Sequence, residues 1–77
     1  MNKQQLNGWM VFNGWTIDRF GHYKKEMNGN KYRMKVQATS LRYEVNSGTG
    51  WVRLRSGYFK DLSISPDGKL CGLKRGY

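Results

Sequence analysis

The sequence predicts a small all-β protein, an antiparallel meander of about five to seven short strands. Three observations predict this fold class: turn dipeptides recur along the chain, aromatic and β-branched residues fill the runs between them, and helical periodicity is nearly absent. Alanine, the best helix former, occurs once. We expect the sheet to close into a small barrel or to bend strongly, in the size range of SH3 and OB domains. The helical element that we expect is a short turn at residues 2–6.

The chain of 77 residues is long enough for one domain only. We treat residues 1–77 as a single β domain and expect flexible ends at 1–7 and 74–77. Three Trp, five Tyr and three Phe, with a single Pro, favour a folded chain. Leu, Ile, Val and Phe nevertheless fall just under the ~20% level below which highly charged chains tend to be disordered. We therefore expect modest stability.

Two turn signals in the first half of the chain are Asn-Gly dipeptides, which favour two-residue hairpins because both positions need positive φ. The first, at residues 13–14, would pair Phe12 with Trp15 and Met10 with Ile17. The second, at residues 28–29, would pair His22 with Lys35, Tyr23 with Met34, Lys24 with Arg33, Lys25 with Tyr32 and Glu26 with Lys31. Strand 31–36 then alternates between a cationic outer face and an apolar inner face, as a half-buried strand does.

A third hairpin is predicted to run from 41–45 through a loop at 46–49 into 50–55. We prefer the register that pairs Tyr43 with Val52, Leu41 with Leu54, Arg42 with Arg53 and Glu44 with Trp51. A shift by one residue would bring arginines into the core and is disfavoured for that reason.

The fourth hairpin contains a three-residue loop, Pro66-Asp67-Gly68, which is typical of a type I turn followed by a glycine bulge. This loop pairs Ile64 with Leu70. Cys71 follows in the second strand, where we expect it to be a small buried hydrophobic residue. A lone cysteine excludes a disulfide scaffold and favours a reducing compartment. With a polar start unlike a signal peptide and no apolar run near ~18 residues, we expect a cytoplasmic protein without a membrane partner.

Charge is the feature that suggests a function. Fourteen basic and five acidic residues give a formal net charge of +9. Two predicted hairpins place like charges opposite each other on the outer face, Lys24 with Arg33 and Arg42 with Arg53. Such pairs are destabilising by some tenths of a kcal/mol each, so a cationic face is reasonable where a polyanion neutralises it. The same charges could also form a simply solvated face.

Trp51 is predicted on the cationic face beside Arg53 and Arg55, where the indole could stack a base while the arginines hold phosphates. We therefore predict a non-catalytic module that binds a polyanion, most readily single-stranded RNA or DNA, with little sequence preference. About six to ten phosphate contacts would weaken binding by ~10³–10⁵ between about 50 and 200 mM salt. Phe59 could extend the surface, whose predicted binding residues are Lys24, Lys31, Arg33, Lys35, Arg42, Trp51, Arg53, Arg55 and Tyr58.

Two other functions stay open at this stage. One is a protein-binding adaptor or inhibitor that docks an acidic partner or adds a strand at a sheet edge. The other is a small metal-independent ribonuclease with His22 as general base, Arg33 or Lys35 stabilising the transition state, and Tyr23 or Tyr32 as acid. We expect no cofactor, no small-molecule substrate and no metal site, because His22 and Cys71 are too few ligands and the carboxylates are scattered.

Overall fold

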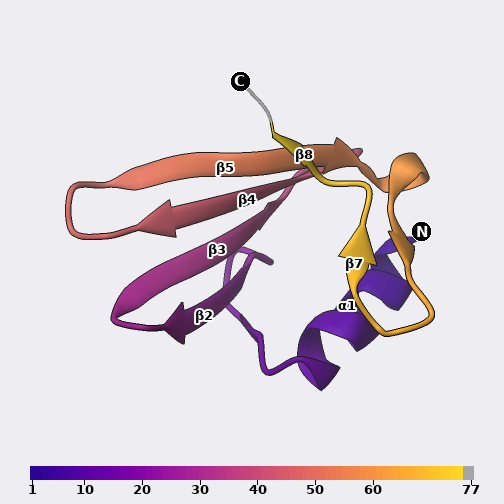
Figure 1. Cartoon of the computed structure of the whole chain (residues 1–77), viewed down its shortest axis with the longest axis horizontal. Coiled ribbons are helices and arrows are strands. Elements are labelled where there is room, and N and C mark those ends of the chain that lie inside the picture. Colours follow the sequence, from indigo (N-terminus) through magenta and orange to yellow (C-terminus); the bar gives the residue numbers. More distant parts are fainter. Residues whose placement is uncertain (76–77) are drawn as a thin grey trace.

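The computed structural model describes residues 1–75, in which every strand pairing is antiparallel. Six strands form one sheet in the order β1-β2-β3-β4-β5-β8, and β6 and β7 form a separate hairpin (Figure 1). The predicted antiparallel meander is confirmed. Because β1 and β8 are unpaired edges in this part of the chain, the sheet is open and the predicted barrel closure does not occur. The elements are α1 (Lys3–Phe12), β1 (Thr16–Ile17), β2 (Tyr23–Met27), β3 (Asn30–Val36), β4 (Ser40–Asn46), β5 (Trp51–Tyr58), the 3-10 helix η1 (Phe59–Asp61), β6 (Ser63–Ile64), β7 (Leu70–Cys71) and β8 (Lys74–Arg75).

The N-terminal helix is longer than the short turn predicted at residues 2–6. It begins with a capping box, in which the Asn2 side chain accepts the N–H of Gln5 and the Gln5 side chain accepts the N–H of Asn2. Leu6 and Met10 lie four residues apart, so both side chains project from the same side of the helix. Both are almost fully buried, with exposed fractions of 1% and 0%. Burial of this pair against the sheet holds ten residues in a helix that weak periodicity did not predict.

Asn13 and Gly14 end α1 instead of forming a hairpin. Asn13 is the C-cap, and Gly14 has a φ of +83°, the left-handed conformation that commonly follows a helix. A glycine with positive φ fits a helix end as well as a hairpin turn, so the Asn-Gly dipeptide alone does not distinguish the two. The predicted pairs of Phe12 with Trp15 and Met10 with Ile17 are wrong, and Ile17 pairs with Tyr23 instead.

The β2–β3 hairpin has the predicted register. Asn28 and Gly29 have φ of 52° and 80°, as a type I′ turn requires. Tyr23 lies opposite Met34, Lys24 opposite Arg33, Lys25 opposite Tyr32, and Glu26 opposite Lys31. The turn and the alternating pattern agree, and together they specify the pairing.

The β4–β5 hairpin has a different register from the predicted one. Asn46 belongs to β4, and its Oδ1 accepts the N–H groups of Gly48 and Gly50, so the loop comprises residues 47–50 rather than 46–49. A bulge then shifts the pairing by one residue between Tyr43 and Glu44. The predicted pairs in this hairpin are therefore wrong; the observed pairs are Asn46 with Trp51, Val45 with Val52, Glu44 with Arg53, Tyr43 with Arg55, Arg42 with Ser56 and Leu41 with Gly57.

The last hairpin matches its prediction in register and turn. Ile64 lies opposite Leu70, the N–H of Ser65 donates to the carbonyl of Lys69, and Gly68 has a φ of +85°. Cys71 is in β7 as predicted, but it is exposed rather than buried. The reason is alternation: Leu70 takes the inner side of this two-residue strand and packs against the core.

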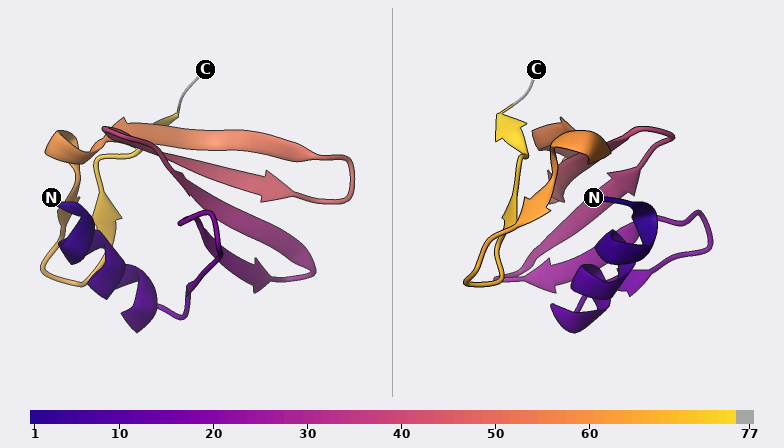
Figure 2. Two further views of the ribbon diagram at one scale, coloured as in Figure 1. Left: turned by 180° about the vertical axis from the view of Figure 1, so that it is seen from behind. Right: turned by 90° about the vertical axis from the view of Figure 1, so that its right-hand side faces the viewer.

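The core lies on one face of the sheet. Figures 1 and 2 show α1 and the β6–β7 hairpin gathered at one end of this face, while the β2–β3 and β4–β5 turns extend away from them. Within residues 1–75, the opposite face carries neither helix nor hairpin (Figure 2). It is therefore the face on which polar side chains of the sheet are free to meet a partner. The buried hydrophobic residues are Leu6, Met10, Trp15, Tyr23, Met34, Leu41, Phe59 and Leu62.

Both ends of the described chain contact the rest of the fold. The Met1 ammonium donates a hydrogen bond to the carbonyl of Phe59 (3.0 Å), and β8 pairs with β5. The predicted flexibility of residues 1–7 and 74–77 concerns motion and stays a prediction, and residues 76–77 lie outside the described part. Within residues 1–75, α1 is too short to cross a membrane and no other helix is longer.

Candidate nucleic-acid interface

Three rows of side chains cross the sheet on the face opposite the core. Residues that lie opposite each other on neighbouring strands point to the same side, so the register defines each row. We call this surface the basic face, because it holds seven basic and two acidic side chains. Its first row, nearest the hairpin turns, is Glu26, Lys31, Asn46 and Trp51; the second is Lys24, Arg33, Glu44 and Arg53; and the third is Lys35, Arg42, Ser56 and Lys74.

The structure brings most of the predicted binding residues together on this face. Tyr58 adjoins the third row, opposite Ser40 at the end of β4. Arg55 does not belong to the group, because the bulge places it opposite Tyr43, whose side chain faces the core side. Phe59 is buried in the core and cannot extend the surface as predicted. The predicted residues that do share the basic face or adjoin it are Lys24, Lys31, Arg33, Lys35, Arg42, Trp51, Arg53 and Tyr58.

Lys74 is a member of the basic face that sequence reasoning missed. The sequence predicts a flexible tail at residues 74–77, whereas β8 pairs Lys74 with Ser56 of β5 and places it in the third row. This pairing joins two segments separated by a 3-10 helix and a hairpin, so no local pattern could have shown it. The like-charge pair predicted between Arg42 and Arg53 is wrong, since Arg42 lies opposite Ser56 and Arg53 lies opposite Glu44. Arg42 does have a like charge opposite it on β3, Lys35.

Trp51 is held in place by a cation and a carboxylate. The guanidinium carbon of Arg33 lies 4.1 Å from the centroid of the indole ring. Nε and Nη2 of Arg33 each lie 2.8 Å from Oε1 of Glu44. Glu44 as a whole is only 7% exposed. A buried carboxylate needs such a partner, and a guanidinium over a tryptophan face is favourable. The half-buried indole is therefore fixed in orientation and remains partly accessible.

The acidic residues neutralise the basic face unevenly. Arg33 is paired with Glu44, and Lys24 lies 3.5 Å from Asp18. Burial alone would raise the pKa of Asp18, but the backbone N–H groups of His22 and Phe20, together with the Lys24 ammonium, hold that pKa below its usual value. Asp18 is thus a stable counter-ion for Lys24. No carboxylate of residues 1–75 forms an ion pair with the remaining basic residues of this face, Lys31, Lys35, Arg42, Arg53 and Lys74.

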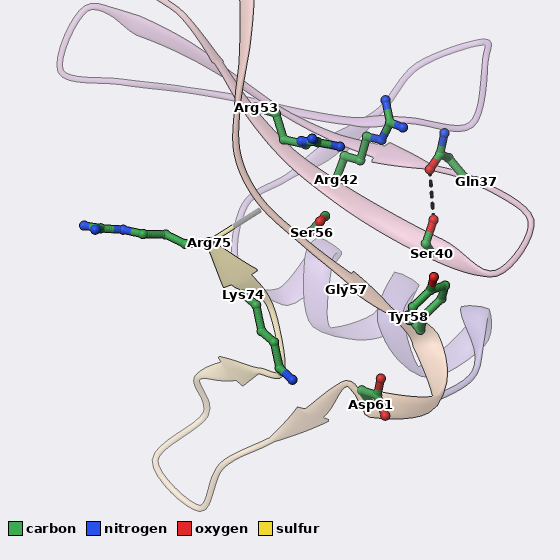
Figure 3. Close-up of a pocket in the computed structure, with 11 residues that line it drawn as sticks. Gln37, Ser40, Arg42, Arg53, Ser56, Gly57, Tyr58, Asp61, Lys74 and Arg75 are labelled. Atoms are coloured by element: carbon green, nitrogen blue, oxygen red, sulfur yellow. Dashed lines mark hydrogen bonds between the residues drawn. The ribbon is translucent and has the colours of Figure 1, made fainter. Parts of the chain in front are cut away.

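Two hollows lie along the basic face. One, of about 440 Å³, is bordered by Trp51, Lys31, Lys24 and Asn46, close to the hairpin turns. The other, of about 400 Å³, lies between β4, β5 and β8 (Figure 3). Figure 3 shows Lys74 extending toward Asp61, and Arg75 pointing away from the other side chains. The second hollow is lined by Gln37, Ser40, Arg42, Arg53, Ser56, Gly57, Tyr58, Asp61, Gly72, Lys74 and Arg75.

The histidine of the ribonuclease hypothesis has a structural contact. Nδ1 of His22 accepts the N–H of Val36 at 2.9 Å, so this nitrogen is already engaged at the end of β3. Tyr23 is buried, and burial raises the pKa of its hydroxyl, which donates to Oδ1 of Asn7 (2.8 Å) on the core side. Residues 1–75 contain no cluster of three or more His, Cys, Asp or Glu side chains that could hold a metal ion. The geometry of this region therefore favours structural roles for His22 and Tyr23.

Comparison with known proteins gives no relative: no protein family model matches the chain, and no curated protein or solved structure is significantly similar to it.

Proposed function

We propose that the protein is a non-catalytic module that binds single-stranded nucleic acid on the basic face. The observation that carries the proposal is Trp51, which Arg33 holds at the edge of the basic face. Apart from Arg33 and Lys24, the basic residues of this face form no ion pair with an acidic residue within residues 1–75. A base would stack on the accessible part of the indole, and Arg42 and Arg53 would bind phosphates. Contacts to the backbone and to a ring face carry little sequence information, so we expect little sequence preference.

A single strand fits this surface better than a duplex. The basic face is made of strands, and α1 lies on the other side of the sheet, so it is not placed to enter a major groove. Stacking on Trp51 requires a base with a free face, which an unpaired strand offers. RNA and DNA both meet these requirements, and both are included as probes in the tests below.

Replacing Trp51 with alanine is the first test. Trp51→Ala should weaken binding of a labelled oligo(dT) or oligo(U) of about 12 nucleotides by about tenfold or more, because one stacked base is worth ~1–3 kcal/mol. Fluorescence anisotropy measures the change at constant salt. Trp51→Phe should retain most of the affinity, and Val52→Ala, on the opposite face of the same strand, should change little. Equal affinities for Trp51→Ala and the unchanged protein would exclude stacking at this site.

Arg53 and Arg55 provide a matched pair of charge removals. They lie two residues apart on β5, but Arg53 is on the basic face and Arg55 is opposite Tyr43 on the other side. Arg53→Ala should weaken oligonucleotide binding by about fivefold to tenfold, as the loss of one charge-assisted contact does. Arg55→Ala should reduce it by no more than about twofold, through net charge alone. Similar losses in the two variants would mean that total charge, and not the basic face, attracts the ligand.

An adaptor that binds an acidic protein is the second candidate, supported by one edge of the sheet. β8 pairs with β5 only at Arg55 and Ser56, so the outer edge of β5 is unpaired from Trp51 to Leu54 within the described chain. Val52 on this segment is 56% exposed. An unpaired edge with apolar side chains is the feature used in strand addition. Failure of both oligonucleotides to bind would leave this candidate as the better one.

The proposed location is the cytoplasm. Cys71 is free and exposed, and a reducing compartment keeps such a thiol from oxidation. The net charge of +9 would attract nucleic acids there at long range.

A further inference from the structure

The hollow between β4, β5 and β8 concentrates unpaired cations at one corner of the basic face. Arg42, Arg53 and Lys74 all line it, and none of them forms an ion pair with residues 1–75 (Figure 3). By contrast, Arg33 on β3 and Lys24 on β2 have Glu44 and Asp18 as counter-ions. The repulsion among cations at the corner is therefore relieved most directly when an anion from outside enters the hollow.

The basic face ends at this hollow. β5 ends at Tyr58, where the chain enters η1, and β8 is the outermost strand on this side of the sheet, so no strand of the described chain extends the face past the hollow. Asp61 also lines the hollow, on the side toward which Lys74 extends, so an anion is expected beside Arg42 and Arg53, away from this carboxylate (Figure 3). A strand that stacks on Trp51 and follows β5 thus reaches its natural end at the hollow.

We infer that this hollow takes the terminal phosphate monoester of the bound strand. A monoester carries about −1.5 to −2 charges at pH 7 and three free oxygens, whereas an internal diester carries one charge. Arg42 and Arg53 can each bind phosphate oxygens in a two-pronged manner, and Lys74, which extends toward Asp61, adds positive charge to the hollow (Figure 3). The hydroxyls of Ser56 and Tyr58 also line the hollow and can donate hydrogen bonds.

The distance to Trp51 suits one short strand. Trp51 and Ser56 are five residues apart on β5, which corresponds to about 17 Å along an extended chain. A strand of a few nucleotides could therefore stack on Trp51 and place its end in the hollow. This inference rests on the proposed function and adds the chemistry of the strand end to it.

The test compares oligonucleotides of one sequence that differ only at their ends. Oligo(dT) and oligo(U) probes carry a 5′-phosphate, a 3′-phosphate or hydroxyls at both ends, and anisotropy is measured at constant salt near pH 7.5. One of the two phosphorylated probes, either the 5′ or the 3′ form, should bind about tenfold more tightly than the hydroxyl-ended probe. This is the size expected for added charge-assisted hydrogen bonds. The preferred end identifies the polarity of the strand. The preference should shrink at pH 5, because the second pKa of the phosphate is about 6.

Two variants locate the effect. Arg42→Ala should abolish most of the preference for the phosphorylated end, whereas Lys31→Ala, in the first row, should weaken all probes alike and keep the preference. Equal affinity for all three ends would overturn this inference while the proposed function stands. A preference that survives Arg42→Ala would also overturn it. Absence of binding by every probe would overturn both, and a circular dichroism spectrum of each variant verifies that it is folded.

Discussion

Raising the salt concentration from about 50 to about 200 mM is expected to weaken single-strand binding by about 100-fold. The size follows from the five basic residues of the basic face that lack an acidic partner in the described chain, at a slope of about 0.7 per phosphate contact. The loss is smaller than the one predicted from the sequence, because Arg33 and Lys24 are occupied by Glu44 and Asp18. Anisotropy titrations at four salt concentrations measure the slope.

Single variants show which cations set that slope. Arg42→Ala should reduce it by about 0.7, the value of one contact. Lys69→Ala, in the β6–β7 loop beside Asp67, removes a charge of the same sign away from the basic face and should leave the slope unchanged. A slope near zero for the unchanged protein would show that binding, if present, does not depend on phosphate contacts.

Replacing Gly72 with alanine is expected to destabilise the fold by more than about 3 kcal/mol, most of the stability of a domain this small. Gly72 has a φ of +103°, and a Cβ there would overlap the backbone carbonyl of Asp61. The same contact positions β8, so loss of the fold and loss of Lys74 from the basic face should occur together. Urea denaturation followed by circular dichroism measures the change.

Gly50 separates backbone strain from steric overlap. It has a similar φ of +112°, but a Cβ at this position would have no neighbouring atom within 4 Å. Gly50→Ala should therefore cost only about 1 kcal/mol, the strain of a left-handed alanine. Equal losses in the two variants would show that the approach of Gly72 to Asp61 is not what makes a glycine necessary there.

Short-range signals predicted the parts of the fold in which turn chemistry and alternation agree. The β2–β3 hairpin and the β6–β7 hairpin have the predicted pairs. An Asn-Gly turn or a glycine bulge sets the register of each, and that register places the apolar residues on one side of the strands. The cationic outer side of β3, and the position of Trp51 on the same side of β5 as Arg53, follow from alternation within each strand. These residues supply much of the candidate interface.

Long-range contacts decided the rest. The Asn-Gly dipeptide at residues 13–14 could end a helix or turn a hairpin, and the burial of Leu6 and Met10 against the sheet selected the helix. A bulge in β5 moved Arg55 to the core side, and the pairing of β8 with β5 brought Lys74 to the basic face. Alternation is a property of each strand, so residue order reveals it. Bulges, strand partners and the docking of a helix depend on packing between distant segments, so only the assembled fold settles which cations share a surface.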